Sequence, residues 1–229
     1  MKTSRGEDSF VKLPSFAAKL YDSMMQSSAT KMQYREIAQD LVSRMGSGRL
    51  LDVGTGPGYL LREIHKLNPE IELHGLDISN SMVKQAGRNL AGVKVDLQCG
   101  NIRATNYKDD HFDLVTCSGS FYLWDNPIES LEEIHRILKL GRAAYLYETH
   151  RDIDKQKLWQ KMRENLKGDN IIRKLLAPRF FIKQIGMTYA KEEIAEIIEK
   201  TSFARSYAIE EIIIFNLPVW VRVRLEKCA

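Results

Sequence analysis

The spacing of three glycines between residues 54 and 58 is the clearest sign of a ligand-binding site in this chain. Gly54, Gly56 and Gly58 follow the apolar stretch 49–53 and precede a helical pattern. Glycine has no Cβ, so backbone N–H groups in such a turn can approach a charged ligand group closely. A dinucleotide-binding fingerprint reads G-x-G-x-x-G, and its third glycine would stand where this chain has Tyr59. That difference weakens the interpretation as a nicotinamide-binding oxidoreductase without excluding it.

A single carboxylate, Asp77, ends the next apolar segment 19 residues after Gly58. A carboxylate about 20 residues beyond such a turn accepts hydrogen bonds from the hydroxyls of a nucleotide ribose. The alternative is that Asp77 only caps the helix that follows Ser79. Because open α/β sheets bind ligands at the carboxyl ends of their strands, the two features predict one site there.

Apolar segments alternate with helical patterns and would position these groups. Strands are expected at 49–53, 72–76, 93–98, 112–117 and 143–147. Helices are expected at 34–45, after Gly58, after Ser79 and at 128–138. Two further strands, 206–215 and 219–225, would be joined by a tight turn at 216–218. The alternation predicts a parallel sheet covered on both faces.

The composition excludes several classes of protein. The chain has 229 residues, of which 44% are hydrophobic and 28% charged, with a net charge of +4, as in ordinary globular domains. No apolar run approaches the roughly 18 residues of a membrane span, and the start MKTSRGEDSF lacks the apolar stretch of a secretory signal. We therefore expect a cytoplasmic protein with one domain, 1–229. The three cysteines, Cys99, Cys117 and Cys228, have no metal-ligand spacing, so no metal site is expected.

Several motifs taken together resemble those of class I S-adenosylmethionine-dependent methyltransferases. LLDVGTGPG at 50–58 is similar to the first motif of that family, HGLDIS at 74–79 to the second, and GNI at 100–102 to the third. HFDLVTCSGSFYLW at 111–124 resembles the fourth, and EIHRILKLGR at 133–142 resembles the segment before the fifth strand. The resemblance covers residues 34–148 and points to the type 11 branch of ubiquinone/menaquinone C-methyltransferases.

The resemblance implies a Rossmann-like, doubly wound α/β sheet of seven mostly parallel strands, with an antiparallel last strand and a helical insertion at 150–190. Residues 1–33 would form an N-terminal cap helix region. The implied activity is transfer of a methyl group from S-adenosylmethionine to a small-molecule acceptor by in-line displacement. The implied cofactor-binding residues are Tyr21, Asp52, Gly54, Gly56, Gly58, Asp77, Ile78, Met82, Asn101, Ile102 and Ser118. The family more often has Asp at position 101, so Asn101 has a second interpretation as a turn residue.

No catalytic base is evident from the motifs. Displacement at a sulfonium needs positioning and a dry pocket, and it does not always need a strong base. His150, after the fifth strand, and Tyr122, after the fourth motif, are candidates for catalysis or acceptor contact. Each also has a structural interpretation, His150 as a rim residue and Tyr122 as part of an aromatic core. The acceptor and the existence of a base stay open.

The excess of basic over acidic residues lies in one segment of the chain. Residues 151–190 hold ten Lys or Arg and four acidic residues. Within them, the stretch 179–183 mixes aromatic and basic side chains that could grip an anionic or amphipathic acceptor, contact a membrane surface peripherally or form a homodimer contact. A solvated helix face is the alternative. The mild net charge makes a nucleic-acid partner unexpected. An RNA- or protein-modifying methyltransferase and a non-catalytic S-adenosylmethionine-binding module are the competing hypotheses.

Overall fold

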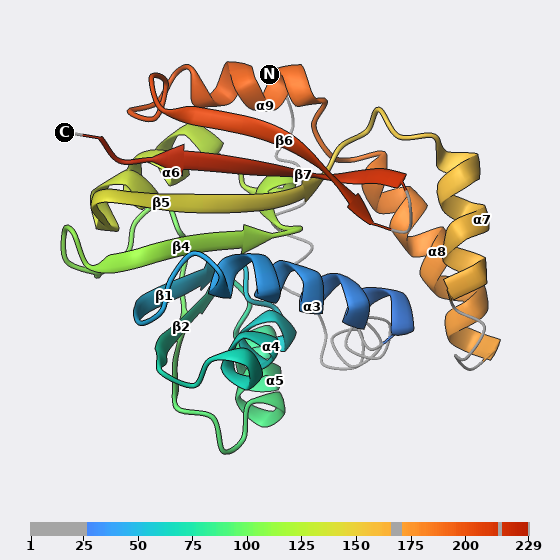
Figure 1. Ribbon diagram of the computed structural model, residues 1–229, viewed down its shortest axis with the longest axis horizontal. Helices are drawn as coiled ribbons and strands as arrows, with labels where there is room; N and C mark the ends of the chain where they lie inside the picture. Colours follow the sequence, from blue (N-terminus) through green and yellow to red (C-terminus); the bar gives the residue numbers. More distant parts are fainter. Residues whose placement is uncertain (1–26, 166–170, 215–216, 229) are drawn as a thin grey trace.

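The computed structural model describes residues 27–165, 171–214 and 217–228. Within these ranges, seven strands form one sheet in the order β3-β2-β1-β4-β5-β7-β6 (Figure 1). The strands are β1 (Gly48–Val53), β2 (Ile71–Asp77), β3 (Val95–Cys99), β4 (Phe112–Ser118), β5 (Leu138–Thr149), β6 (Tyr207–Ile214) and β7 (Leu217–Glu226). The helices are α3 (Ser28–Val42), α4 (Tyr59–Leu67), α5 (Asn80–Asn89), α6 (Pro127–Ile137), α7 (Lys155–Asn165), α8 (Ile171–Ile185) and α9 (Lys191–Ile198), with the short 3-10 helix η1 (Phe121–Leu123).

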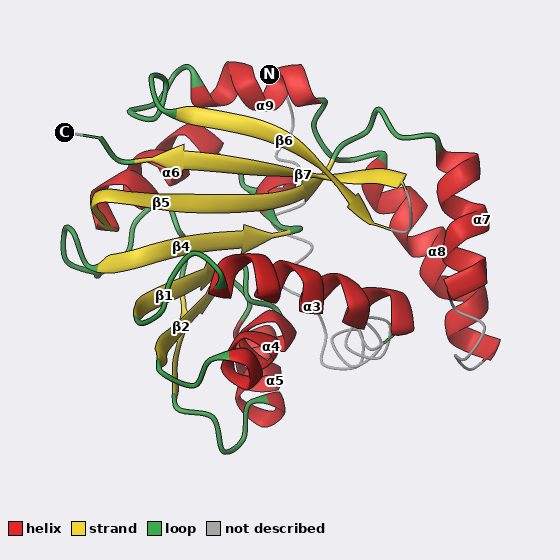
Figure 2. Ribbon diagram, viewed as in Figure 1, coloured by secondary structure: helices red, strands yellow, loops and turns green. Residues whose placement is uncertain are grey.

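The directions of the strands agree with the prediction. The strands β1 to β5 run parallel to one another, and β7 runs antiparallel to both β5 and β6. Helices cover both faces of the sheet (Figure 2). Helices α7 and α8 lie side by side beyond the carboxyl end of β5, in the segment expected to be a helical insertion (Figure 1). The predicted doubly wound sheet with an antiparallel last strand is therefore confirmed.

Alternation along each strand sends side chains into two hydrophobic clusters, one on each face of the sheet. In β1, Leu50 packs in the cluster that contains α3 and α4, whereas Leu51 packs in the cluster that contains α6 and α9. In β5, Tyr145 and Leu146 divide in the same way. Because both faces are covered, the inner strands are apolar on both sides, which explains their continuous apolar runs.

Two strands, β5 and β7, extend beyond their predicted boundaries by two residues or more. β5 begins at Leu138 rather than five residues later. Its first residue pairs with Phe112, and a bulge then takes up the residues around Gly141 before regular pairing resumes. β7 begins at Leu217, which the sequence pattern had assigned to a turn. Both differences arise because pairing with a neighbouring strand extends a strand beyond its apolar segment.

The helix α3 also begins earlier than predicted and is fastened to the sheet. Its start is set by the buried Ser27, whose side chain accepts a hydrogen bond from the N–H of Thr30. Farther along, Asp40 accepts hydrogen bonds from the Tyr147 hydroxyl of β5 at 2.5 Å and from Arg222 of β7 at 2.7 Å. Burial alone would raise the pKa of Asp40, but these hydrogen bonds and one from Arg44 lower it overall. The carboxylate thus holds α3 against two strands.

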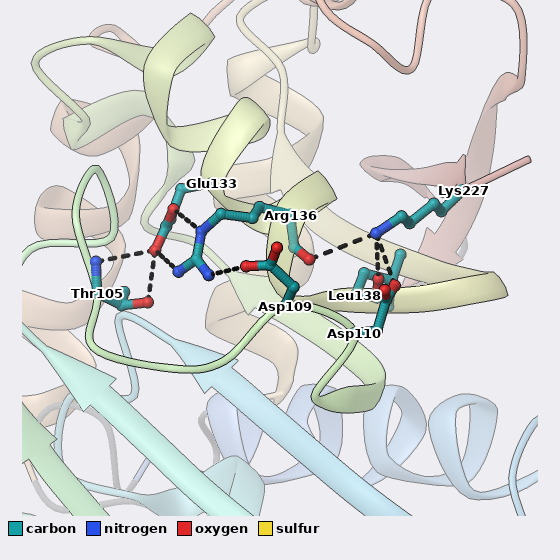
Figure 3. A network of polar contacts seen from close by, with 7 residues as sticks. All are labelled: Thr105, Asp109, Asp110, Glu133, Arg136, Leu138 and Lys227. Atoms are coloured by element: carbon teal, nitrogen blue, oxygen red, sulfur yellow. Dashed lines mark hydrogen bonds and ion pairs between the residues drawn. The ribbon is translucent and has the colours of Figure 1, made fainter.

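A polar network joins α6 to the loop between β3 and β4, and Lys227 after β7 to the start of β5 (Figure 3). Arg136 of α6 donates to Glu133 and to Asp109, in both cases at 2.6 Å. The same Glu133 carboxylate accepts the N–H of Thr105 at 2.9 Å. Lys227, just after β7, donates to the first carbonyl of β5 at 2.9 Å. The network fixes the loop between β3 and β4, whose other end reaches the site described next.

Candidate functional site

A cavity of about 120 Å³ lies at the carboxyl ends of β1, β2, β3 and β4, and we refer to it as the first cavity. Parallel strands end at a common edge, and this is where open α/β sheets bind ligands. Its wall is made by Tyr34, Val53, Gly54, Thr55, Gly56, Pro57, Leu76, Asp77, Ile78, Met82, Gly100, Asn101, Ile102, Ser118, Gly119, Ser120, Tyr122, Leu123, Trp124 and Asp125. Residues from four strand ends, α3 and η1 therefore meet at one place.

The glycine turn after β1 is shaped by close packing. The N–H of Gly54 donates to the carbonyl of Leu76 at 2.8 Å, which joins the turn to β2. A Cβ on Gly54 would lie only 2.1 Å from the Ser120 hydroxyl. Gly58 is not part of the cavity wall; a Cβ there would meet Leu90 at 2.8 Å. The first and third glycines are thus required by neighbouring atoms, and only the first of them faces the cavity.

Asp77 lies in the cavity wall and also holds the turn around it. One carboxylate oxygen accepts the N–H of Gly56 at 2.8 Å, and the other accepts the N–H of Ser79 at 2.8 Å. Burial raises the pKa of Asp77, while these two hydrogen bonds lower it, and the net shift is upward. Each carboxylate oxygen has a second lone pair that the two N–H bonds do not use. Asp77 therefore both pins the start of α5 and presents acceptor capacity to the cavity.

Asp52 is in the glycine motif but lies behind the wall. It is fully buried, and one oxygen accepts a hydrogen bond from the Thr55 hydroxyl at 2.9 Å. Its other oxygen has no partner within the described part of the chain. Burial, together with the nearby Asp77, raises the pKa of Asp52 to about 7. Asp52 therefore does not line the cavity itself, but it contacts Thr55, which does.

One side of the first cavity is apolar. Ile78, Met82 and Ile102 lie in the wall, and Met82 and Ile102 are buried. Asn101 lies beside them, and its side-chain oxygen accepts the N–H of Arg103 at 3.0 Å. This bond is the turn interaction that its alternative interpretation predicted. A flat apolar ligand group would fit between these side chains.

Of the remaining predicted residues, some line the first cavity and others do not. Ser118 and the buried Tyr122 both lie in the wall of the first cavity. His150 is not among the wall residues; it is buried beyond β5, with Nδ1 3.6 Å from an Asp152 oxygen. Tyr21 lies outside the described residues. The structure therefore brings Tyr122 to the cavity and does not bring His150 there.

Sequence reasoning missed several wall residues. Thr55 stands inside the glycine motif, so the motif itself could have indicated it. Ser120 lies within the fourth motif and Asp125 follows it, but neither residue type nor spacing marks them. Tyr34 comes from α3 and reaches the cavity only because Asp40 and its partners hold that helix on the sheet. No local signal could have found Tyr34.

A second buried carboxylate, Glu148, supports the loop after β4. It is fully buried, and one oxygen accepts the N–H of Phe121 at 2.7 Å, whereas the other has no partner among the described residues. Burial raises the pKa of Glu148 to about 8, even though the N–H groups of the loop lower it. The loop that it holds, 118–124, supplies a large share of the cavity wall.

The raised pKa of Glu148 predicts a pH-dependent stability. A carboxyl group whose pKa is higher in the folded state stabilises the protein fully below pH 4.5, and this stabilisation is lost as the pH rises toward about 8. Gln mimics the protonated carboxyl, so Glu148→Gln should match the parent near pH 5. At pH 9 it should exceed the parent in free energy of unfolding by about 4 kcal/mol. Urea denaturation at a series of pH values measures the difference.

The matched control for this experiment is Glu133→Gln. Burial alone would raise the pKa of Glu133, but hydrogen bonds from Arg136 and Thr105 lower it overall. Its stabilising contribution is therefore present above pH 4.5 and is lost as the pH falls below that value. Glu133→Gln should destabilise the protein at neutral pH, the opposite sign to Glu148→Gln. Parallel pH profiles for Glu148→Gln and the parent would contradict the prediction.

Two kinds of feature are absent from residues 27–165, 171–214 and 217–228. No group of three or more His, Cys, Asp or Glu side chains in these ranges is arranged to hold a metal ion. Within the same ranges, no helix combines the length and the hydropathy that crossing a bilayer requires.

One known protein family matches the part of the chain that contains this site. Residues 50–141 match a family model described as a methyltransferase domain. The matched segment begins in β1 and ends in the first part of β5, so it contains the glycine turn, Asp77, Asn101 and Ser118.

Curated relatives match about half of the chain. An uncharacterized methyltransferase, YdaC, of Bacillus subtilis is 30% identical over 105 residues, which are 46% of this chain and 58% of that protein. The ubiquinone/menaquinone biosynthesis C-methyltransferase UbiE of Desulfotalea psychrophila is 29% identical over 104 residues, 45% of this chain and 42% of that protein. The chain spans about half the length of the curated relatives it matches.

Solved structures match over nearly the whole chain. The plantazolicin methyltransferase BamL, crystallised with a desmethyl plantazolicin analogue and S-adenosylhomocysteine, has a TM-score of 0.72 at 14% identity and covers 96% of this chain and 93% of its own. A S-adenosylmethionine-dependent methyltransferase from Aquifex aeolicus has a TM-score of 0.65 at 16% identity, covering 93% and 98%. At these identities the likeness concerns the fold.

Proposed function

We propose, from the premise that residues 50–141 belong to the S-adenosylmethionine-dependent methyltransferase family, that this chain transfers a methyl group from S-adenosylmethionine to a small-molecule acceptor. The observation that carries the proposal is the first cavity. It joins the glycine turn, the Asp77 carboxylate and an apolar side at the carboxyl edge of the sheet. These are the features that an amino-acid carboxylate, a ribose and a base require together.

The wall residues fit this cofactor. The N–H groups of Gly54 and Gly56 are engaged by Leu76 and Asp77, so the turn would instead admit the cofactor's carboxylate against its backbone, where a Cβ on Gly56 would meet nothing closer than 4.0 Å. Asp77 would accept the ribose hydroxyls. Ile78 and Ile102 would pack on the adenine.

The other predicted cofactor residues have supporting roles in this proposal. Met82 would complete the apolar side, and Asn101 would hydrogen-bond the adenine edge. Ser118 would lie near the methionine part, and Tyr21 would close over it. Asp52 and Gly58 would shape the turn, since neither lines the cavity.

The chemistry needs little beyond orientation and the exclusion of water. When bound, the cofactor would supply a methyl group on a sulfonium, whose bonding electron pair would stay on sulfur as a lone pair of the acceptor takes the methyl group, and the proton released by the acceptor would pass to bulk solvent after the transfer. The chain's part is to hold the acceptor in line behind the methyl group. Tyr122, buried in the wall, is the side chain we assign to this positioning.

Calorimetric titration tests the proposal. S-adenosylmethionine and S-adenosylhomocysteine should bind with micromolar affinity, and NADH, the control for the nicotinamide alternative, should not bind. Transfer of a tritiated methyl group to a panel of small molecules then separates an enzyme from a non-catalytic binding module. Binding of NADH in place of the other two, or of none of the three, would refute the proposal.

The domain organisation is part of the same proposal. We treat residues 1–229 as one domain with a cap region at 1–33 and an insertion at 150–190. The helices α7 and α8 between β5 and α9 support the insertion. A cytoplasmic location, a homodimer and peripheral membrane contact stay predictions from the sequence alone.

A further inference from the structure

A second, smaller cavity adjoins the first. It has a volume of about 30 Å³ and is lined by Thr30, Gln33, Tyr34, Ser118, Gly119, Thr149, Phe181, Gln184 and Trp220. Tyr34, Ser118 and Gly119 belong to the walls of both cavities. A ligand group in the second cavity would therefore face, across Ser118, the part of the first cavity assigned above to the methionine portion of the cofactor.

Four uncharged polar side chains in this wall have unused hydrogen-bonding capacity. The Ser118 hydroxyl is buried and has no partner among the described residues. In the same ranges, no hydrogen bond engages the amide of Gln33 or the hydroxyl of Thr149, which are only 7% and 6% exposed, or the amide of Gln184. A buried polar group without a partner is unfavourable in a folded protein. The Ser118 hydroxyl is such a group, and the other three side chains line the same cavity. Their convergence on one cavity indicates a ligand that bonds with them.

The rest of the wall is aromatic and carries no formal charge. Phe181 of α8, the buried Trp220 of β7 and Tyr34 of α3 contribute rings. None of the nine lining residues is Asp, Glu, Lys, Arg or His. A charged group entering such a wall would lose its hydration without gaining an ion pair.

The basic residues of the neighbouring helices are directed elsewhere. Arg179 donates to the carbonyl of Leu175 at 2.6 Å and lies over the ring of Trp159. Lys183 is exposed, and neither residue lines the second cavity. The stretch 179–183 thus contributes an aromatic ring to the wall and leaves its positive charges outside.

We infer that the second cavity is the acceptor subsite, and that it receives an uncharged group able both to donate and to accept hydrogen bonds, such as a hydroxyl or a carboxamide, attached to a flat apolar body. The inference rests on the proposed function and names the substrate class of its site. A volume near 30 Å³ holds about two water-sized groups. The polar group and the atoms next to it therefore enter, while the body of the acceptor extends outward along the rings.

Matched probes test the charge preference directly. Benzamide and benzoate have the same shape, but only benzoate is charged at neutral pH. We expect benzamide, titrated into the full chain saturated with S-adenosylhomocysteine and followed by ligand-observed NMR, to bind at least 10-fold more tightly than benzoate. Equal affinities, tighter binding of benzoate or binding of neither probe would overturn the inference.

Variants test whether the preference for the uncharged probe arises in the second cavity. Gln33→Leu should weaken benzamide binding about 10-fold, whereas Gln39→Leu, on the exposed side of the same helix, should leave it unchanged. Gln184→Lys places a positive charge in the wall and should shift the preference toward benzoate. Equal effects of Gln33→Leu and Gln39→Leu, or no shift in preference with Gln184→Lys, would count against the subsite.

The cofactor titration separates the two proposals. All three variants should bind S-adenosylhomocysteine with the parent's affinity, because Gln33, Gln39 and Gln184 lie outside the first cavity. If the parent binds S-adenosylhomocysteine but shows no preference for benzamide, only the acceptor inference fails. If the parent does not bind S-adenosylhomocysteine, the proposed function fails, and the acceptor inference fails with it.

Discussion

Asp77→Ala is expected to weaken binding of S-adenosylhomocysteine at least 100-fold. The substitution removes the carboxylate that lies in the wall between the glycine turn and α5, and with it the proposed bonds to both ribose hydroxyls. Hydrogen bonds to a charged group contribute about 1.5–3 kcal/mol each, so two of them account for a loss of this size. The N–H groups of Gly56 and Ser79 would also lose their acceptor, which loosens the turn.

Two further variants make the Asp77 result interpretable. Asp77→Asn keeps one oxygen acceptor and should show an intermediate loss of about 10-fold. Asp96→Ala removes an exposed carboxylate from the neighbouring strand β3, outside the cavity wall, and should bind S-adenosylhomocysteine as the parent does. Calorimetry measures all three, with thermal melting to check that each is folded. A folded Asp77→Ala protein with the parent's affinity would show that the carboxylate is only a structural cap.

Of the substitutions that add a single methyl group to the turn, Gly54→Ala is expected to reduce stability and cofactor binding most. Its Cβ would lie 2.1 Å from the Ser120 hydroxyl oxygen and 2.6 Å from the Ser120 Cβ, and φ at this residue is +71°. Left-handed backbone costs an alanine about 1 kcal/mol, and the steric conflict adds to it, for a total of about 3 kcal/mol. Binding of S-adenosylhomocysteine should fall more than 10-fold, because relief of the conflict moves the turn or the loop after β4.

Gly92→Ala is the matched control for this substitution. Gly92 has φ of +86°, but a Cβ there would meet nothing within 4 Å. It should therefore lose only the backbone term of about 1 kcal/mol and keep full cofactor binding. Adding Ser120→Gly to Gly54→Ala should restore most of the lost stability, since it removes the atoms in conflict. Urea midpoints compare the variants; equal losses for Gly54→Ala and Gly92→Ala would refute the steric explanation.

The family, the sheet and the cofactor class were predictable because their signals are local. The glycine turn is continuous in sequence, and the strands on either side of it show the apolar runs of a sheet covered on both faces. Once these strands are parallel, their carboxyl ends must lie at one edge, so Asp77 and the turn are brought together by topology. The strand order confirms the sheet, and residues 50–141 match a methyltransferase domain, in agreement with the family that the motifs resemble.

The membership of individual residues in the site was less predictable. Asp52 and Gly58 share the motif with Gly54 but lie behind the wall, because a tight turn needs residues that face the core as well as residues that face the ligand. The end of β5 shows a similar division. Thr149 reaches the second cavity, whereas Glu148 holds the loop after β4 and His150 lies away from both cavities. Strand alternation decides this division, and the residue types do not reveal it.

The sequence alone was thus enough to predict the fold class and the edge of the sheet at which the first cavity lies, because both depend on periodicity and on one short motif. The tertiary structure alone decided what surrounds the proposed acceptor. Gln33, Thr149 and Trp220 come from α3, β5 and β7, and they meet because Asp40 fastens α3 to the two strands. Contacts between segments so far apart follow from packing and leave no local pattern in the sequence. For the basic stretch 179–183 the sequence left an anionic or amphipathic acceptor, a membrane surface, a homodimer contact and a solvated helix face open, and only the folded chain reveals that its charges lie outside the second cavity.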